Sequence, residues 1–249
     1  MKKLAWTIPF LVAAACSSEP EASSPTDAGT VVVTGDTGGG GGSGGAGGGN
    51  CTAAREQLLQ PIDMVSTGAI TVLSDTGGVK TLFVDASAGG IPAAGANPRI
   101  YLNLETATRV DVTDKTAATS TAWDLAIKRP ILFTNSGDGG SGQGGALIVA
   151  KDFEAVSSAD ASAEIFAPER FFEADCTAKV DATGAVRTSF DGWNDYDLAT
   201  NILTPHAGTW LVKGATGKLF KLQILSYYAA PDGGVGQSGG RYTFKVGAL

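Results

Sequence analysis

The chain has 249 residues, with 18 Lys and Arg against 25 Asp and Glu, a formal net charge of −7 and a single His. One His excludes zinc sites built from several imidazoles. The acidic balance, with no basic stripe anywhere, argues against nucleic acid as a partner, because phosphate contacts need clustered Lys and Arg. Apolar residues make up 43% of the chain, which is enough for one packed core and indicates one domain.

Residues 1–15 have the pattern of an export signal. Two lysines precede an apolar run from Leu4 to Val12, and small residues follow up to Cys16. The run is too short to span a bilayer, which needs about 20 apolar residues. Small residues directly before a Cys resemble the lipobox of bacterial lipoproteins, which implies that Cys16 is lipidated and begins the mature chain. The alternative is an ordinary secretory peptide that is cleaved near Ala15.

Residues 16–50 form the lipidated Cys and an expected tether. The two residues after Cys16 are serines, and the absence of Asp there resembles lipoproteins that are sorted to the outer membrane. Ser, Thr, Asp, Pro and Gly then dominate, with ten glycines between Gly38 and Gly49. We expect this segment to be disordered, with an end-to-end distance of about 30 Å. A domain held so far from the outer membrane is expected to be surface-exposed and to meet a partner there.

Cys51 and Cys176 remain as an even pair in a chain with an export signal. This pattern predicts a disulfide between them. The bond would close a long loop and contribute about 4–5 kcal/mol in the chain-entropy model. The alternative, a reactive thiol, lacks a nearby His or basic cluster that would activate it.

The expected β domain covers residues 51–249. A short helix is predicted over Thr52–Gln60, ended by Pro61, and the segment Asp152–Cys176 stays ambiguous, with helical character around Ala159–Ile165. Short segments with period-two hydrophobicity predict ten strands: Ala69–Ser74, Val79–Ala86, Arg99–Glu105, Arg109–Thr113, Thr121–Lys128, Ile131–Asn135, Ala146–Lys151, Thr209–Lys213, Lys218–Tyr228 and Arg241–Val246. In the longest, Phe220, Leu222, Ile224 and Tyr228 are expected on one face. This pattern predicts an all-β fold, an antiparallel sandwich or open barrel.

Two glycine motifs resemble those of enzymes. Gly137–Gly142 matches G-x-G-x-x-G, and Gly236–Gly240 matches the G-x-S-x-G of serine hydrolases. Both enzyme motifs must lead into a helix, whereas both segments here run into predicted strands. We therefore interpret them as turns between strands and expect no enzymatic activity.

Two further features are candidates for ligand binding. Oxygen-bearing side chains cluster around Trp193 and could hold calcium, but their spacing does not match the twelve-residue calcium loop and favours a solvated turn; they belong to Asp191, Asn194, Asp195 and Asp197. His206 is the only imidazole available to a metal, although a lone His in a loop is also typical of an ordinary surface position.

Several strings together resemble the HmuY family of haem-binding bacterial surface lipoproteins. The matching strings are Trp123–Arg129, Thr134–Ala146, Gly184–Val186, Trp193, Tyr196–Asp197 and Gly217–Tyr228. The resemblance covers about Arg99 to Leu249. It implies an all-β fold of the HmuY type, an acylated N-terminus in a Gram-negative bacterium, and haem held between axial side chains.

The resemblance does not supply the haem ligands. The haem-binding member of the family uses two His residues, and this chain has one. His206 lies outside the matching strings and remains a candidate ligand of haem through its own chemistry, with Tyr ligation or purely hydrophobic binding as alternatives. The function expected is capture of haem or a related tetrapyrrole for uptake, with host haemoproteins and an outer-membrane receptor as partners. The alternative is a surface binding or adhesion module without haem.

Overall fold

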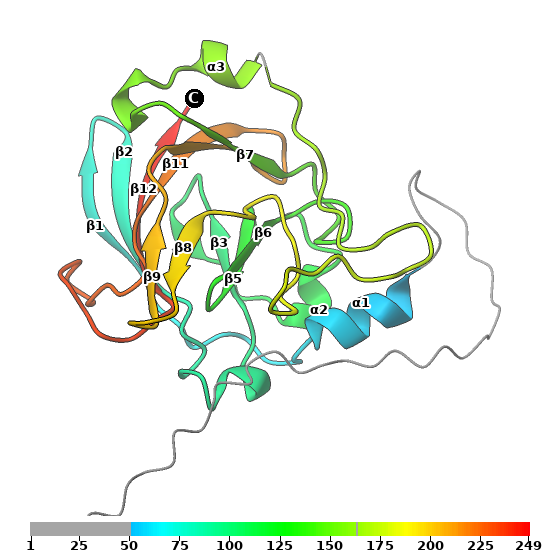
Figure 1. Ribbon diagram of the computed structural model, residues 1–249. Helices are drawn as coiled ribbons and strands as arrows, with labels where there is room; N and C mark the ends of the chain where they lie inside the picture. Colours follow the sequence, from blue (N-terminus) through cyan, green and yellow to red (C-terminus); the bar gives the residue numbers. More distant parts are fainter. Residues whose placement is uncertain (1–50, 163) are drawn as a thin grey trace, which may run out of the picture.

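The structure is a computed structural model, and it describes residues 51–162 and 164–249 (Figure 1). The expected signal peptide, the lipidation site at Cys16 and the tether lie outside these residues. Within the described residues, no helix has the length and apolar character needed to cross a membrane.

Two antiparallel sheets form the body of the molecule, and a separate hairpin lies beside them. The larger sheet has the order β1-β2-β12-β11-β10-β7, the smaller has the order β4-β3-β5-β6, and β8 pairs with β9. The strands are β1 (Ile70–Thr76), β2 (Val79–Asp85), β3 (Ile100–Asn103), β4 (Thr108–Arg109), β5 (Leu125–Lys128), β6 (Ile131–Thr134), β7 (Gly145–Val149), β8 (Asn194–Asp197), β9 (Ile202–Pro205), β10 (Thr209–Lys213), β11 (Leu219–Ser226) and β12 (Arg241–Ala248). The larger sheet ends at β1 and β7, so it does not close into a barrel.

The core lies between the two sheets, which makes the fold an open sandwich. Leu82 and Phe244 of the larger sheet pack in one buried cluster with Leu102 and Ile127 of the smaller one. This arrangement confirms the all-β, antiparallel prediction. It follows from alternating strands, each of which buries one face against the other sheet.

The longest predicted strand shows the expected alternation and one departure from it. In β11, Phe220 and Ile224 are buried, whereas Lys221 and Gln223 are only partly so. The pairing with β12 then shifts after Ile224, which indicates a bulge. Because a bulge inserts one residue, it reverses the inward and outward positions that follow. Tyr227 is therefore buried in the core, at 3% exposure, whereas Tyr228, predicted on the face of Ile224, is partly buried and packs against the same core cluster.

The helices are short and lie at the periphery. They are α1 (Thr52–Leu59), α2 (Asp114–Ala117) and α3 (Ser158–Ser162), with 3-10 turns η1 (Ala94–Ala96) and η2 (Phe153–Ala155). The predicted N-terminal helix is present and ends one residue early, because Gln60 adopts a left-handed conformation with φ 44°. The ambiguous segment before Cys176 contributes η2 and α3 and no strand among its described residues.

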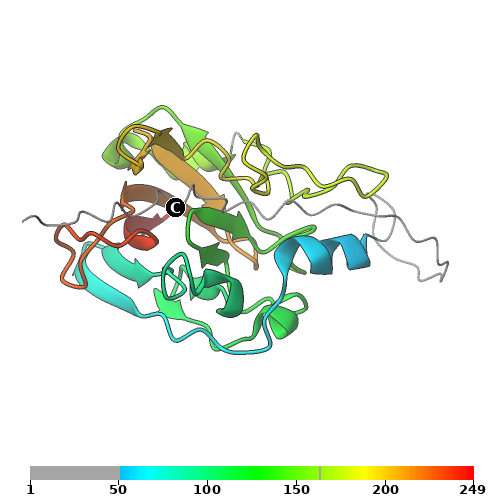
Figure 2. The same ribbon diagram turned by 60° about the horizontal axis from the view of Figure 1, so that its bottom comes forward.

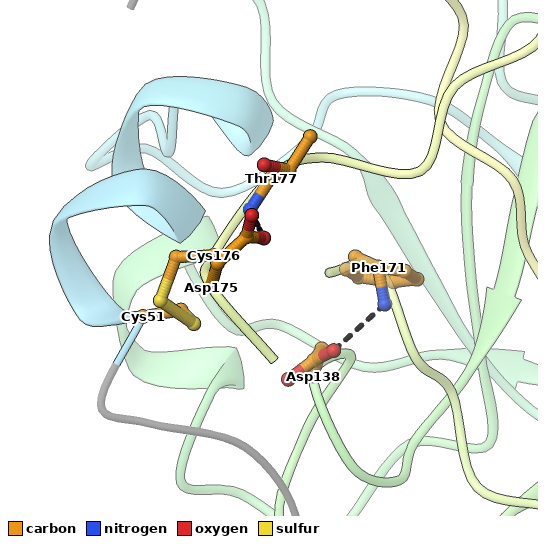
Figure 3. The surroundings of a disulfide bond; sticks show 6 residues. All are labelled: Cys51, Asp138, Phe171, Asp175, Cys176 and Thr177. Carbon is orange, nitrogen blue, oxygen red and sulfur yellow. Dashed lines mark hydrogen bonds between the residues drawn. A yellow bond between two sulfur atoms is a disulfide. The ribbon is translucent and has the colours of Figure 1, made fainter. Parts of the chain in front are cut away.

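A disulfide ties α1 to the rest of the domain. The structure contains the predicted Cys51–Cys176 bond, with Cα atoms 5.4 Å apart. Figure 3 shows this bond beside α1, with Asp138 accepting a hydrogen bond from the Phe171 amide nearby at 2.7 Å. Arg55 on α1 donates to the carbonyl of Asp138 at 2.6 Å. In Figure 2, α1 lies at one side of the sandwich, next to the loop that carries Cys176.

Candidate functional site

The candidate ligand His206 directly follows a hairpin that the sequence did not predict. Strand β8 comes from the Asp-rich segment that we interpreted as a solvated turn, and it pairs with β9 from Asn194↔Pro205 to Asp197↔Ile202. Leu203 of β9 faces the core at 9% exposure. Its neighbours in β9, Ile202 and Thr204, therefore face solvent, as do Asp195 and Asp197 opposite them.

His206 is half exposed and is held by Asp195. Its side chain is 40% exposed, and Nε2 lies 2.7 Å from a carboxylate oxygen of Asp195. Its backbone N–H donates to the carbonyl of Trp193 at 2.8 Å, which continues the hairpin by one pair. A carboxylate that binds one ring nitrogen fixes the orientation of the imidazole and leaves the other nitrogen for a metal. The His206–Asp195 pair can therefore present one imidazole ligand.

The other acidic residues of the segment are used separately. Asp191 pairs with Arg187 at 3.1 Å. Asp197 accepts hydrogen bonds from the Thr200 hydroxyl and the Ala199 amide, both at 2.8 Å, and these bonds lower the pKa of its carboxyl group. Across the described residues, no three His, Cys, Asp or Glu side chains gather as a metal site.

An aromatic cluster lies behind the hairpin and serves as framework. The ring of Trp193 packs against Tyr227 at 5.8 Å and Tyr242 at 5.6 Å between centroids. The Trp193 indole donates to the Pro130 carbonyl at 2.9 Å, and the Tyr242 hydroxyl donates to the Arg129 carbonyl at 2.6 Å. Burial raises the pKa of Tyr242 well above its usual value. This hydroxyl is therefore protonated and committed to the fold, and it is not a ligand candidate.

Tyr228 has a similar structural role. Its hydroxyl accepts a hydrogen bond from the Leu203 amide at 3.1 Å and lies 3.5 Å from the Asn201 carbonyl. The side chain thereby holds the hairpin against the end of β11. Iron ligation by Tyr228 would require its hydroxyl to lose the proton that it directs at the Asn201 carbonyl.

Trp123 and Asp124, which begin the family-like string Trp123–Arg129, also stabilise the fold. Trp123 is fully buried and donates its indole N–H to the Ala117 carbonyl at 2.9 Å. Asp124 accepts hydrogen bonds from the Leu104 amide at 2.7 Å and the Ala215 amide at 2.8 Å. Burial raises the pKa of Asp124, and these two bonds oppose that shift. The carboxylate thus connects the turn at Leu104, after β3 of the smaller sheet, with the turn at Ala215, after β10 of the larger sheet.

The glycine-rich run is packed and continues into a strand. A Cβ atom on Gly140 would lie 2.2 Å from the side-chain oxygen of Asn135 and 2.9 Å from Trp123. The run leads into β7 at Gly145, and Gly236–Gly240 leads into β12. Neither segment opens a helix, so neither has the geometry of a dinucleotide loop or a nucleophile elbow.

The donor set limits how haem could be held. A bis-imidazole site needs two His residues, and the chain has one. Ligation by a single imidazole fits His206, because Asp195 supplies the hydrogen-bond partner that metal-bound His residues use. The same face carries the carboxylates of Asp195 and Asp197, which would repel the propionate groups of haem.

The fold and these contacts define an all-β domain with a hydrogen-bonded polar and aromatic framework and one exposed imidazole. The family model described as HmuY protein matches residues 96–245. The chain belongs to the HmuY family.

Three solved structures are similar over most of their length. A protein of Bacteroides fragilis described as a lipoprotein is 19% identical, with 72% of this chain and 93% of that chain covered and a TM-score of 0.43. A protein of Bacteroides vulgatus described as HmuY-like and haem-binding is 14% identical, with 72% and 96% covered and a TM-score of 0.43. The apo HmuY analogue of Tannerella forsythia is 12% identical, with 73% and 96% covered and a TM-score of 0.43. No curated protein matches the chain.

Proposed function

We propose that the protein is a surface lipoprotein that captures haem or a related tetrapyrrole and delivers it for uptake, without transforming it. Membership of the HmuY family over residues 96–245 carries this proposal. The lipobox-like residues before Cys16 and the glycine-rich segment that precedes Cys51 support a domain, residues 51–249, held off the outer membrane. An outer-membrane receptor and host haemoproteins are its proposed partners.

His206 is the proposed axial ligand of the haem iron. It is the one imidazole of the chain, it is 40% exposed, and Asp195 contacts one of its ring nitrogens at 2.7 Å. One imidazole leaves the sixth position of a ferric iron open or occupied by water. We therefore expect weaker haem binding than at a site with two imidazoles.

Titration of the protein with haemin should give a saturable change in the Soret band. His206→Ala should abolish the sharp band of the imidazole-ligated iron while the unfolding transition stays unchanged, because the side chain is exposed and bonds only to exposed Asp195. Thr204→Ala is the matched control, since it removes a side chain from the same face of β9 and should leave the Soret band as in the wild type.

Two results would contradict parts of this proposal. A Soret change that survives His206→Ala would move ligation to a Tyr or to hydrophobic binding. The absence of any saturable change in the wild type would contradict haem capture. That result would favour the alternative, a surface binding module without haem. The carboxylates of Asp195 and Asp197 beside His206 support this alternative, because they would repel an anionic porphyrin.

The lipoprotein proposal has its own test. Cys16→Ser removes the thiol that would be acylated, so the variant should remain unprocessed or be released from the membrane fraction. Wild-type protein should fractionate with outer membranes and carry the added mass of a lipid. Equal membrane fractionation of the variant, together with a wild-type mass that shows no lipid, would favour cleavage near Ala15 as an ordinary secretory peptide.

A further inference from the structure

A second candidate site lies at the opposite end of the sandwich from His206. There the β1–β2 turn, the start of β11 and the end of β12 meet the turn between β3 and β4, near the label C in Figure 1. They surround a pocket of about 370 Å³. Pockets for small molecules span about 300–1,000 Å³, so this volume lies at the lower end of that range. The haem proposal does not involve these residues, although Lys218, Leu219 and Phe220 belong to the family-like string Gly217–Tyr228.

The floor of the pocket is apolar because nearly buried core side chains lie directly beneath it, with exposures of 2–4%. Leu104, Phe220 and Val246 line it, and all three belong to the main core cluster between the sheets. Leu104 comes from the smaller sheet's turn, and the other two come from the larger sheet. An apolar group in this pocket would therefore extend the core and be shielded from water on two sides.

The rim of the pocket carries two lysines and one carboxylate. Lys218 at the start of β11 pairs with the Glu105 carboxylate. Lys80 of β2 donates to the backbone carbonyl of Glu105 at 3.1 Å. Within the described part of the chain, Lys80 makes no ion pair with an acidic side chain, although Asp75 lies opposite it in the β1–β2 register. The rim thus has one cation paired with an internal carboxylate and a second that is bonded to a neutral group.

We propose that this pocket binds a small apolar carboxylate, with its hydrocarbon part on the Leu104–Phe220–Val246 floor and its carboxylate between Lys80 and Lys218. The bound carboxylate takes the place of the Glu105 side chain at Lys218 and gives Lys80 an anionic partner. The volume of about 370 Å³ lies at the lower end of the range for small-molecule pockets, which favours a ligand with a short or medium hydrocarbon chain.

Decanoate is the probe, measured by isothermal titration calorimetry against the full chain below the concentration at which decanoate forms micelles. Decyltrimethylammonium is the matched probe with the same chain and the opposite charge. We expect saturable binding of decanoate and at least tenfold weaker binding of the cation, because the rim selects the anion and the floor selects the chain.

Variants separate the contributions of the rim and the floor. Lys80→Gln combined with Lys218→Gln should lower decanoate affinity at least tenfold. Glu105→Gln should raise it several-fold, because Lys218 is then released from its internal competitor. Ala248→Trp should abolish binding with the charges intact, since Ala248 lines the pocket opposite Phe220 in the strand register. Lys115→Gln, at an exposed ion pair with Asp63 elsewhere, is the charge control and should bind as the wild type does.

Specific outcomes would overturn this proposal independently of the haem site. Equal binding of the two probes, or no saturable heat with decanoate, would contradict it. A decrease in affinity on Glu105→Gln would contradict the exchange of carboxylates. His206→Ala should leave decanoate affinity unchanged, so loss of decanoate binding in that variant would show that the two ends are not separate sites.

Discussion

Replacing Cys51 and Cys176 together by Ser is expected to lower the free energy of unfolding by about 4–5 kcal/mol. The bond joins residues 125 positions apart, so its loss restores a large amount of conformational freedom to the unfolded chain. Urea unfolding, followed by Trp fluorescence, measures the change. Both proteins should carry Cys16→Ser, so that no other thiol is present and the comparison isolates this disulfide.

The structure also predicts which segment unfolds locally first when the disulfide is absent. Helix α1 has only eight residues and no side-chain cap at its N-terminus, and isolated helices of this length are unstable in water. Without the disulfide, the ties of α1 that remain include the hydrogen bonds of Arg55 to the carbonyls of Asp138 and Gly139 and the burial of Leu59. Amide exchange should therefore accelerate most in Thr52–Leu59. A loss below about 1 kcal/mol with unchanged exchange there would contradict the pinning role of the bond.

The strands of the sandwich were predictable because their chemistry is local. In β11, Lys221 and Gln223 alternate with Phe220, Leu222 and Ile224, and a strand with one buried face requires this alternation. Each of the ten predicted segments overlaps an observed strand, although Arg109–Thr113 shares only Arg109 with β4. Their ends were less predictable. Trp123 and Asp124, for example, precede β5 because their side chains bond to turns of the fold.

The hairpin β8–β9 could not be found in this way. Its first strand has the sequence Asn-Asp-Tyr-Asp, and such residues favour turns in isolation. It becomes a strand because Leu203 of the partner strand is buried against the core and the Tyr228 hydroxyl binds the Leu203 amide. These are tertiary contacts, and no local pattern encodes them. The bulge after Ile224 was missed for a similar reason.

The candidate sites show the same limit. His206 was identified because it is the single imidazole, but its partner Asp195 follows only from the pairing of two strands. The rim of the second pocket combines Lys80, Glu105 and Lys218, which come from three separate parts of the chain. The type of a residue can identify it as a candidate ligand, whereas its neighbours in space depend on the register and packing of the sheets.

One buried polar network was also invisible in the sequence. Asp114 at the start of α2 accepts hydrogen bonds from the Arg99 amide at 3.0 Å and the Tyr101 hydroxyl at 2.8 Å. Its other oxygen accepts from the Ile62 amide and from the Arg99 guanidinium, both at 3.1 Å. Burial, together with the nearby Asp114, raises the pKa of Tyr101, so this hydroxyl stays protonated and donates. One carboxylate thus joins α2, β3 and the segment after α1.

Asp114→Ala should therefore destabilise the fold by about 3–5 kcal/mol, the usual cost of removing one partner from a buried ion pair. The side chains of Arg99 and Asp114 are 10% and 1% exposed, so the guanidinium would be left charged with little access to water. Arg99 would keep its bond to the Leu59 carbonyl at 2.8 Å, which is a neutral partner and does not replace the carboxylate. Urea unfolding at neutral pH measures the loss.

Two further variants assign the loss to the buried charge. Asp111→Ala removes the partner of Arg109 in an exposed ion pair with an N–O distance of 2.8 Å, and solvent screening should limit its effect to below about 1 kcal/mol. The double variant Asp114→Ala with Arg99→Met removes both charges. It should recover part of the stability lost in Asp114→Ala, because no unpaired cation then remains in the core. Equal effects of Asp111→Ala and Asp114→Ala, or no recovery in the double variant, would show that the lost stability does not come from an uncompensated buried Arg99.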